Sequence, residues 1–251
     1  MTDRAEFIAG VTVALGRTVV KAPLPDAATT LFETVETAKL NADRAKADAT
    51  DRSIEMTERM AESAEAIGWM VHHADNPEDA ADVIANICTQ QNAKSVLRSA
   101  HGVLTDMPLD SAITSTGATL GITEHTDPTD SAEQNRVREQ AQNTVFKADV
   151  GVTGVDHAIA ETGTVVLRPR RGVSRLVSLA PPTHIAVLRP GEVLESLDEL
   201  FAIERDDFLS GEPTGSMNLI SGPSKTGDIE GTIVTGIHGP LEVHLVILAN
   251  T

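Results

Sequence analysis

The sequence has little of several residue types on which whole classes of protein depend. Its 251 residues include one cysteine, no tyrosine, one tryptophan and five phenylalanines. A single cysteine excludes an intramolecular disulfide and any iron–sulfur cluster ligated by cysteines of this chain alone. With so few aromatic residues, we expect an aliphatic core in which Trp69 and the phenylalanines serve as local anchors.

Basic residues are also scarce, with 20 Lys and Arg against 37 Asp and Glu and a net charge of -17. A surface of this sign repels nucleic acids and anionic membranes, so we expect neither as a partner. Few of the basic residues are lysines, and the apolar side chains are mostly small. This combination suggests a halophilic protein, whose acidic surface stays hydrated in high salt while screening weakens self-repulsion.

Long hydrophobic runs are missing too. No apolar stretch reaches the length of a membrane span, and the first residues lack the basic start and apolar run of a signal peptide. We therefore expect a cytoplasmic protein with no membrane insertion. The hydrophobic fraction of 41% is that of a globular protein, and the length allows one sizeable core.

The first 67 residues read as a helical extension that precedes an α/β domain at 68–251. Apolar residues at helical spacing, among them Phe7 and Val11, predict a helix over 3–16. A linker with two prolines follows, so this helix is free to pack on a partner chain and to support a homo-oligomer. From Thr30 to Ile67 the pattern predicts two helices or one interrupted helix.

Strand and helix patterns alternate through the rest of the chain. Strands are expected at 68–73, 94–98, 118–123, 149–153, 164–167, 184–188, 217–221 and 241–248, and helices at 77–88, 108–114, 131–145 and 193–201. Such alternation predicts an α/β fold, a three-layer α/β/α sandwich with a mainly parallel sheet. Cys88 lies on the apolar side of its helix and is expected to be an inert core thiol. His72 and His73 would face opposite sides of a strand, so no metal site is expected.

One polar loop, Gly151 to Gly163, follows a strand at the end where ligands bind in open α/β sheets. It holds Asp156, Glu161 and Thr162. Asp156 fits a turn cap as well as a functional acid. Glu161 is either a buried acid satisfied by backbone donors or a catalytic acid with a raised pKa.

A second polar stretch, Asn218 to Pro240, combines glycines, hydroxyls and charges. Its candidate ligand-binding residues are Ser221, Ser224, Lys225, Thr226, Asp228 and Glu230, with His238 as a candidate catalytic residue. The alternative is a polar turn between two buried strands. The stretch is no ordinary phosphate loop, because Pro223 removes an N–H group that such a loop needs.

Between these stretches, Arg168 to Arg175 holds four arginines in an otherwise acidic sequence, which favours an anionic ligand or an acidic partner, with Arg175 as a candidate ligand. No dinucleotide-binding or Walker fingerprint is present.

These segments resemble the lactate-utilisation protein C family, the LutC/YkgG group of LUD-domain proteins. The matching stretches are GVTGVDHAIAETGT from Gly151, RLVSLAPPTHIAV from Arg175, SGPSKTGDIEGT from Ser221 and GIHGP from Gly236. The resemblance implies a fold like the NagB/RpiA/CoA-transferase superfamily. It also implies a lactate-oxidising system in which partner subunits carry iron–sulfur clusters, and the single cysteine fits a subunit without one.

Two functional hypotheses follow. In the first, the chain is the cluster-free subunit of such a system, with Asp156, Glu161 and Thr162 facing the Ser221–His238 segment across a pocket, and Lys225 and Arg175 binding an anion. In the second, it is a stand-alone enzyme for a phosphorylated or CoA-linked molecule, with Glu161 as nucleophile or base.

Overall fold

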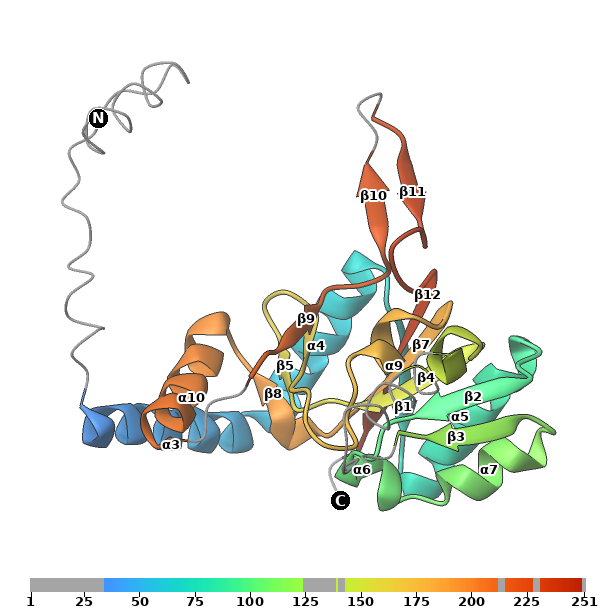
Figure 1. Cartoon of the computed structure of the whole chain (residues 1–251). Coiled ribbons are helices and arrows are strands. Elements are labelled where there is room, and N and C mark those ends of the chain that lie inside the picture. The colour runs from blue at the N-terminus through green and yellow to red at the C-terminus, as the bar shows by residue number, and fades with distance from the viewer. Residues whose placement is uncertain (1–33, 124–138, 140–142, 212–214, 228–230, 250–251) are drawn as a thin grey trace.

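The computed structural model describes residues 34–123, 139, 143–211, 215–227 and 231–249, and it is built around a six-stranded sheet (Figure 1). All neighbouring strands of this sheet are parallel. The strands, in their order across the sheet, are β1 (Met70–Ala74), β12 (Glu242–Leu248), β7 (Thr183–Leu188), β4 (Val150–Gly154), β2 (Ser95–Arg98) and β3 (Thr119–Ile122). The predicted α/β class with a mainly parallel sheet is confirmed.

One face of the sheet is covered by helices α5 (Pro77–Gln90), α6 (Gly102–Thr105) and α7 (Leu109–Ser115). Their apolar side chains join those of the central strands in one core cluster, to which α5 contributes Ile84 and Cys88. Helix α5 begins as the sequence predicts, because the Asn76 side chain caps it and Pro77 occupies its first position. Burial raises the pKa of the Cys88 thiol to about 11, which makes it an inert core residue.

The other face is covered by helix α4 (Ser53–Ile67) and by a second sheet that the sequence did not predict. This sheet has four strands, in the order β8 (Val193–Leu194), β5 (His157–Ile159), β6 (Thr164–Leu167) and β9 (Asn218–Ile220). Alternate side chains of its strands face in two directions, so Val165 packs toward the large sheet while Val166 packs outward. The second sheet therefore has a core on both of its faces.

Helices α3 (Val35–Asp51) and α10 (Leu197–Leu209) cover the outer face of the second sheet and lie side by side at one end of the molecule (Figure 1). The inner face of α3 is made of alanines, which allow a close approach. Two helices thus fill the region predicted between Thr30 and Ile67, separated at Arg52. α4 contributes buried side chains to the core between the two sheets, and α3 contributes to the core on the outer face of the second sheet.

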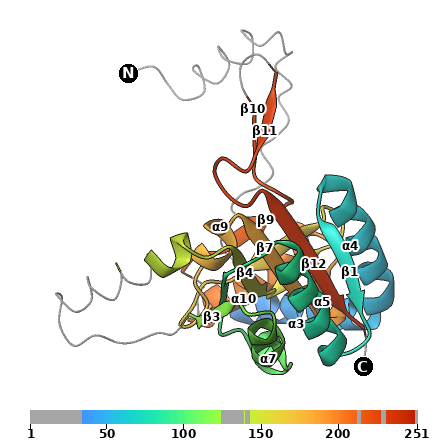
Figure 2. The same ribbon diagram turned by 90° about the vertical axis from the view of Figure 1, so that its right-hand side faces the viewer.

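Strands β10 (Lys225–Gly227) and β11 (Ile233–Thr235) form an antiparallel hairpin that projects from the body (Figures 1 and 2). The remaining elements are short: α9 (Leu176–Leu179) packs against β4, and the 3₁₀ turn η1 (Pro190–Glu192) follows β7. None of the described helices has the length and apolar composition that a membrane crossing requires.

Several sequence expectations were wrong in detail. Val193 and Leu194, expected in a helix, form β8, because α10 begins only after Ser196. The phenylalanines expected as core anchors are not core residues where the structure describes them, since Phe146, Phe201 and Phe208 are all exposed. Trp69 is buried as expected. The predicted helix over 3–16, and most of that over 131–145, lie outside the described residues.

Candidate functional site

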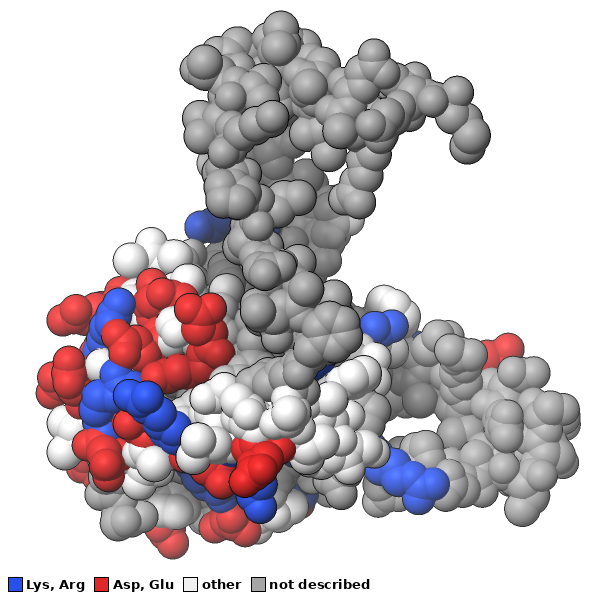
Figure 3. All heavy atoms as spheres, turned by 90° about the vertical axis from the view of Figure 1, so that its left-hand side faces the viewer, with Lys and Arg blue, Asp and Glu red and all other residues white. Residues whose placement is uncertain are grey.

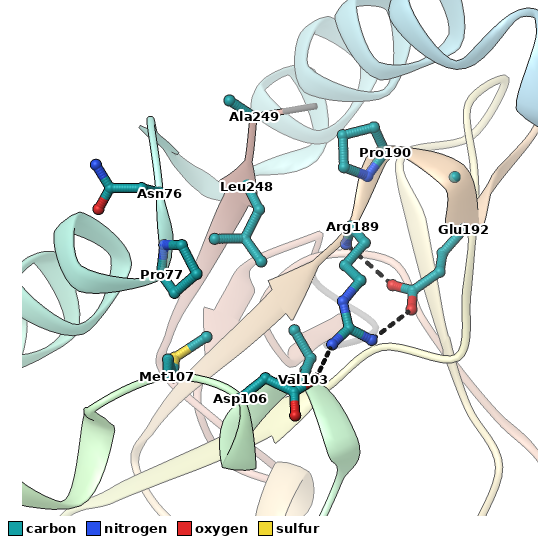
Figure 4. A pocket seen from close by; sticks show the side chains of 11 residues that line it. Asn76, Pro77, Val103, Asp106, Met107, Arg189, Pro190, Glu192, Leu248 and Ala249 are labelled. Atoms are coloured by element: carbon teal, nitrogen blue, oxygen red, sulfur yellow. Dashed lines mark hydrogen bonds and ion pairs between the residues drawn. The ribbon is translucent and has the colours of Figure 1, made fainter. Parts of the chain in front are cut away.

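The carboxyl ends of the six parallel strands, here called the carboxyl edge, hold a cavity of about 410 Å³. Asn76 follows β1, Leu248 ends β12 and Arg189 follows β7, so three neighbouring strands open onto it. The loop after β2 closes the opposite side with Asp106 and Met107. Ligands of open α/β sheets bind at this edge. We call this cavity the carboxyl-edge cleft (Figure 4).

Arg189 and Glu192 place opposite charges inside the cleft. The Arg189 backbone N–H donates to Glu192 Oε2 at 2.9 Å, and the guanidinium lies 3.7 Å from Oε1 of the same carboxylate. A second guanidinium nitrogen donates to Asp106 Oδ2 at 2.6 Å. Figure 4 shows the guanidinium between the two carboxylates. Pro190 at the first position of the 3₁₀ turn η1 folds the chain back, which brings Glu192 beside Arg189.

Among the described carboxyl groups, Glu192 has the pKa that folding shifts most. Burial raises the pKa of its carboxyl to about 7, against the opposing influence of the Arg189 N–H and the Arg189 charge. A carboxyl with this pKa exchanges a proton near neutral pH, as a general acid or base must. The cleft therefore combines a fixed cation, which suits an anionic ligand, with a group that transfers protons.

A buried ion network lies beside the cleft, centred on Asp156 immediately after β4. Its Oδ2 accepts from the Arg168 backbone N–H at 2.6 Å, and its Oδ1 accepts from Arg170 at 2.7 Å. Burial works to raise the pKa of the carboxyl, but the hydrogen bonds from His101 and Arg168 and the charge of Arg170 lower it on balance. Asp156 is thus a stable anion at neutral pH.

His101 joins this network to the cleft. Its Nδ1 accepts from the Val103 backbone N–H at 3.3 Å, so the ring proton belongs on Nε2, which lies 3.3 Å from Asp156 Oδ1. Val103 lines the cleft, and His101 and Asp156 both influence the pKa of Glu192. The pair His101–Asp156 is therefore placed to adjust the proton affinity of Glu192.

The candidate residues of the Gly151–Gly163 loop separate in the structure. Asp156 precedes β5 at the carboxyl edge, whereas Glu161 and Thr162 follow β5 in the turn before β6. Glu161 is exposed, and its Oε1 accepts from the Leu197 N–H at the first position of α10. It therefore caps a helix. Glu161 is satisfied by a backbone donor, as the structural alternative expects, but its side chain is exposed and not buried.

Thr162 does meet a residue of the second polar stretch. Its hydroxyl lies 2.8 Å from that of Thr164, which lies 2.7 Å from the hydroxyl of Ser221. Lys225 donates from Nζ to the Ile67 carbonyl at the end of α4, at 3.2 Å. Ile67 and Gly68 precede β1, so this group belongs to the amino edge of the large sheet. The predicted pocket does not form as a unit, because Asp156 lies at the opposite edge.

The other candidates lie around the hairpin or outside the described residues. Ser224 bonds through its backbone to Pro240 and Gly236, and Thr226 pairs with Val234 within the hairpin. His238 is exposed in the loop after β11. Arg175 is exposed at the start of α9. Asp228 and Glu230 lie outside the described residues.

Sequence reasoning missed Arg189, Glu192, Asp106 and His101. The sequence does carry a signal for these residues. The polar stretch RPGE directly follows a buried strand, and the stretch RSAH begins at the last residue of another strand. Polar residues at strand ends, rather than glycine-rich loops, therefore indicate the site. The carboxyl edge collects all strand ends of a parallel sheet.

Among the described residues, no group of three or more His, Cys, Asp or Glu side chains has the arrangement of a metal site. His184 is a buried core residue, with its Nε2 2.8 Å from Thr153 Oγ1, and burial lowers its pKa to about 3.

Comparisons with known proteins agree on one family. Residues 57–248 match the family model described as the LUD domain. "Lactate utilization protein C" of Exiguobacterium sp. is 39% identical over 124 residues, which cover 47% of this chain and 50% of that protein. The protein of the same name from Bacillus subtilis is 34% identical over 105 residues, or 41% and 44% of the two chains. The chain thus spans about half the length of the curated relatives it matches.

A solved structure supports the fold. The crystal structure of a DUF162 family protein from Deinococcus radiodurans superposes with a TM-score of 0.53 at 20% identity. The superposition covers 78% of this chain and 98% of that one.

Proposed function

Because the chain belongs to the LUD domain family, we propose that it serves lactate utilisation, the process for which its curated relatives are named. In this proposal the chain is the cluster-free subunit of a lactate-oxidising system, and partner subunits carry the iron–sulfur clusters. Its single, buried cysteine supports a subunit without a cluster of its own.

The observation that carries the proposal is the pairing of Arg189 with Glu192 in the carboxyl-edge cleft. Lactate offers a carboxylate, which a guanidinium binds, and a hydroxyl, which must lose its proton on the way to pyruvate. Asp106 now occupies one side of Arg189, but its side chain is 66% exposed and is free to yield to a ligand carboxylate. Glu192, with its pKa raised to about 7, is the group that accepts the hydroxyl proton.

Oxidation of lactate to pyruvate removes the hydroxyl proton and, from C2, a second proton with two electrons. Glu192 accepts the hydroxyl proton, while the residues of this chain bind the carboxylate and orient the hydroxyl. The partner subunits would accept the C2 hydrogen as a proton and two electrons, and their iron–sulfur clusters would carry the electrons onward. Burial is the main cause that raises the pKa of Glu192 to about 7, while His101 and Asp156 make smaller contributions that lower and raise it, respectively.

The second hypothesis, a stand-alone enzyme with Glu161 as nucleophile, gains no support from the geometry. Glu161 is exposed and already caps α10. Glu161 does not line the carboxyl-edge cleft, and within the described part of the chain its Oε1 already accepts from the Leu197 N–H.

Growth of the source organism on lactate tests the proposal. We expect a deletion strain to grow on pyruvate and to fail on lactate as sole carbon source. The wild-type gene restores growth, whereas Glu192→Gln and Arg189→Met reduce it at least about tenfold, the usual cost of losing a general base or an anion clamp. Arg44→Met is the matched control, because Arg44 is 81% exposed on α3, away from the cleft.

Two results would contradict the proposal at different points. Unimpaired growth of the deletion strain on lactate would remove the assignment to lactate utilisation. Full restoration by Glu192→Gln would keep that assignment and exclude the cleft as the working site. Purification of the tagged protein from lactate-grown cells, with measurement of bound iron, tests the partners separately, since a lone iron-free protein argues against them.

A further inference from the structure

Helix α10 carries its charged and apolar side chains in an unusual arrangement. Glu199 on this helix pairs with Arg52 at 2.8 Å, and Glu204 and Asp207 both pair with Arg168. These acids therefore face the protein. Leu200 and Ile203 fill the remaining inner positions against α3 and the second sheet.

The outward stripe of α10 holds two phenylalanines. Phe201 is 54% exposed and Phe208 is 59% exposed, and they are seven residues apart, so they lie on one face of the helix. Arg205 lies between them, its guanidinium carbon 5.9 Å from the centre of the Phe208 ring. A surface helix normally turns its aromatic residues inward. On α10 Asp198 is exposed, as usual for an acid, but both phenylalanines are exposed as well, which marks the Phe201–Phe208 stripe as a surface made to be covered.

Helix α3 extends this apolar surface. Arg52, just after α3, bonds to Glu195 and Glu199 at the start of α10, so the two helices are antiparallel. The beginning of α3, where Val35 is exposed, therefore lies toward the end of α10 that carries Phe208. Figure 3 looks onto this end of the molecule, where acidic and basic side chains gather at one side and uncharged side chains lie beside them.

The chain itself supplies an occupant of matching character. The pattern over residues 3–16 predicts an amphipathic helix whose apolar stripe includes Phe7 and Val11. The intervening residues 17–33 reach at most about 60 Å when extended, far more than the length of α10, which is about 20 Å. In the sequence, residues 17–33 lead to the start of α3, which lies toward the Phe208 end of the stripe.

Residues 3–16 carry Arg4 against Asp3 and Glu6, so apolar contact and the tether, rather than charge, favour this segment. A second copy of a chain with net charge -17 would be repelled. Covalent linkage adds a high effective concentration for docking within the same chain.

We propose that residues 3–16 dock as an amphipathic helix on the Phe201–Phe208 stripe of the same chain. The inference concerns a surface remote from the carboxyl-edge cleft, and it stands independently of the role in lactate utilisation. The docked segment would add an outer helix to α3 and α10.

Amide hydrogen exchange of the full-length protein tests the docking. In the wild type we expect residues 3–16 to exchange at least about tenfold more slowly than an unstructured peptide. The double variant Phe201→Ser with Phe208→Ser abolishes this protection. The single variant Phe146→Ser leaves it unchanged, because Phe146 is 68% exposed but its neighbour Val145 packs in a different core cluster.

The reciprocal variant Phe7→Ser guards against a folding defect in α10, since it leaves the described residues intact and is also expected to abolish the protection. Unprotected residues 3–16 in the wild type, or protection that survives the double variant, would overturn the proposal. Protection that falls on dilution together with a dimer in light scattering would also overturn it, because the occupant would then belong to a second copy.

Discussion

The two edges of the six-stranded sheet are both rich in polar residues, but they use them differently. The amino edge has glycines, hydroxyls and Lys225. Its hydroxyls bond to one another, and Lys225 donates to a backbone carbonyl at the end of α4. The carboxyl edge has the largely buried carboxyls of Asp156 and Glu192, each coupled to an arginine, beside a cavity. Polar composition alone does not separate these cases, whereas burial of charge next to open space does.

The amino edge owes its glycines to close packing. A Cβ at Gly163 would lie 2.6 Å from the Ala64 backbone nitrogen, and one at Gly222 would lie 2.6 Å from the Ile67 carbonyl oxygen. Both glycines also have positive φ, 63° and 86°, which other residues adopt at a cost. The motif that looks most like a ligand loop is therefore the seam between α4 and the second sheet.

The largest expected effect is a loss of stability when the seam between α4 and the second sheet is disturbed. Gly163→Ala should lower the free energy of unfolding by about 4 kcal/mol, because it adds a backbone clash to a left-handed conformation. Denaturant titration measures the change. Gly227→Ala is the control, since no atom lies within 4 Å of the Cβ it would add, and it should change stability by less than about 0.5 kcal/mol. Equal effects at the two glycines would contradict the packing role.

At the carboxyl edge, Asp156→Asn should cost about 3 kcal/mol at neutral pH, because the buried carboxylate accepts charge-assisted hydrogen bonds from the Arg168 N–H and His101 and pairs with the half-exposed Arg170. The pKa of Asp156 is lowered by folding, so its stabilisation is present above the usual pKa of aspartate and is lost as pH falls through the folded value. The gap between variant and wild type should therefore narrow in acid. Unfolding titrations from pH 7 to pH 3 check this, and a constant gap would argue against an ionised carboxylate.

Glu192→Gln should act in the opposite direction and stabilise the protein by about 2 kcal/mol at pH 8. The pKa of Glu192 is raised to about 7 by folding, so the wild type loses stability as pH rises from about 4.5 to 7. The glutamine has no charge to bury, and the two proteins should become equally stable below about pH 4.5. Thermal melts across this range measure the difference. A variant that is less stable at every pH would show that the carboxylate is stabilised by its surroundings.

The smallest expected effect tests whether Lys225 caps helix α4 or binds a ligand. Lys225→Met should cost about 0.5 kcal/mol, since an exposed lysine at the end of α4 only adds a bond to the Ile67 carbonyl. Growth on lactate should be unchanged in the same variant. Stability from denaturant titration and growth rate together test this, and a growth defect without loss of stability would return Lys225 to the candidate site.

The sequence predicted the parallel sheet because strands buried on both faces appear as continuous apolar runs. Strands β6 and β9 were expected, at 164–167 and 217–221, but their membership of a second sheet escaped prediction because β5 and β8, which complete it, are only three and two residues long. The separation of Asp156 from Thr162 depends on recognising β5 as a strand, which places them at its two ends. The pairing of Arg189 with Glu192 could not be predicted, because it depends on the 3₁₀ turn η1, which brings the two residues together.

The strand order also constrains how the protein is made. β12 lies between β1 and β7, so β1 has no neighbour in the sheet until β12 has been synthesised. Pairing β1 with β12 closes a loop of well over a hundred residues, and such distant contacts form slowly. The nascent chain therefore leaves β1 and the facing edge of β7 unpaired until β12 is made, although α4 can already pack on the second sheet.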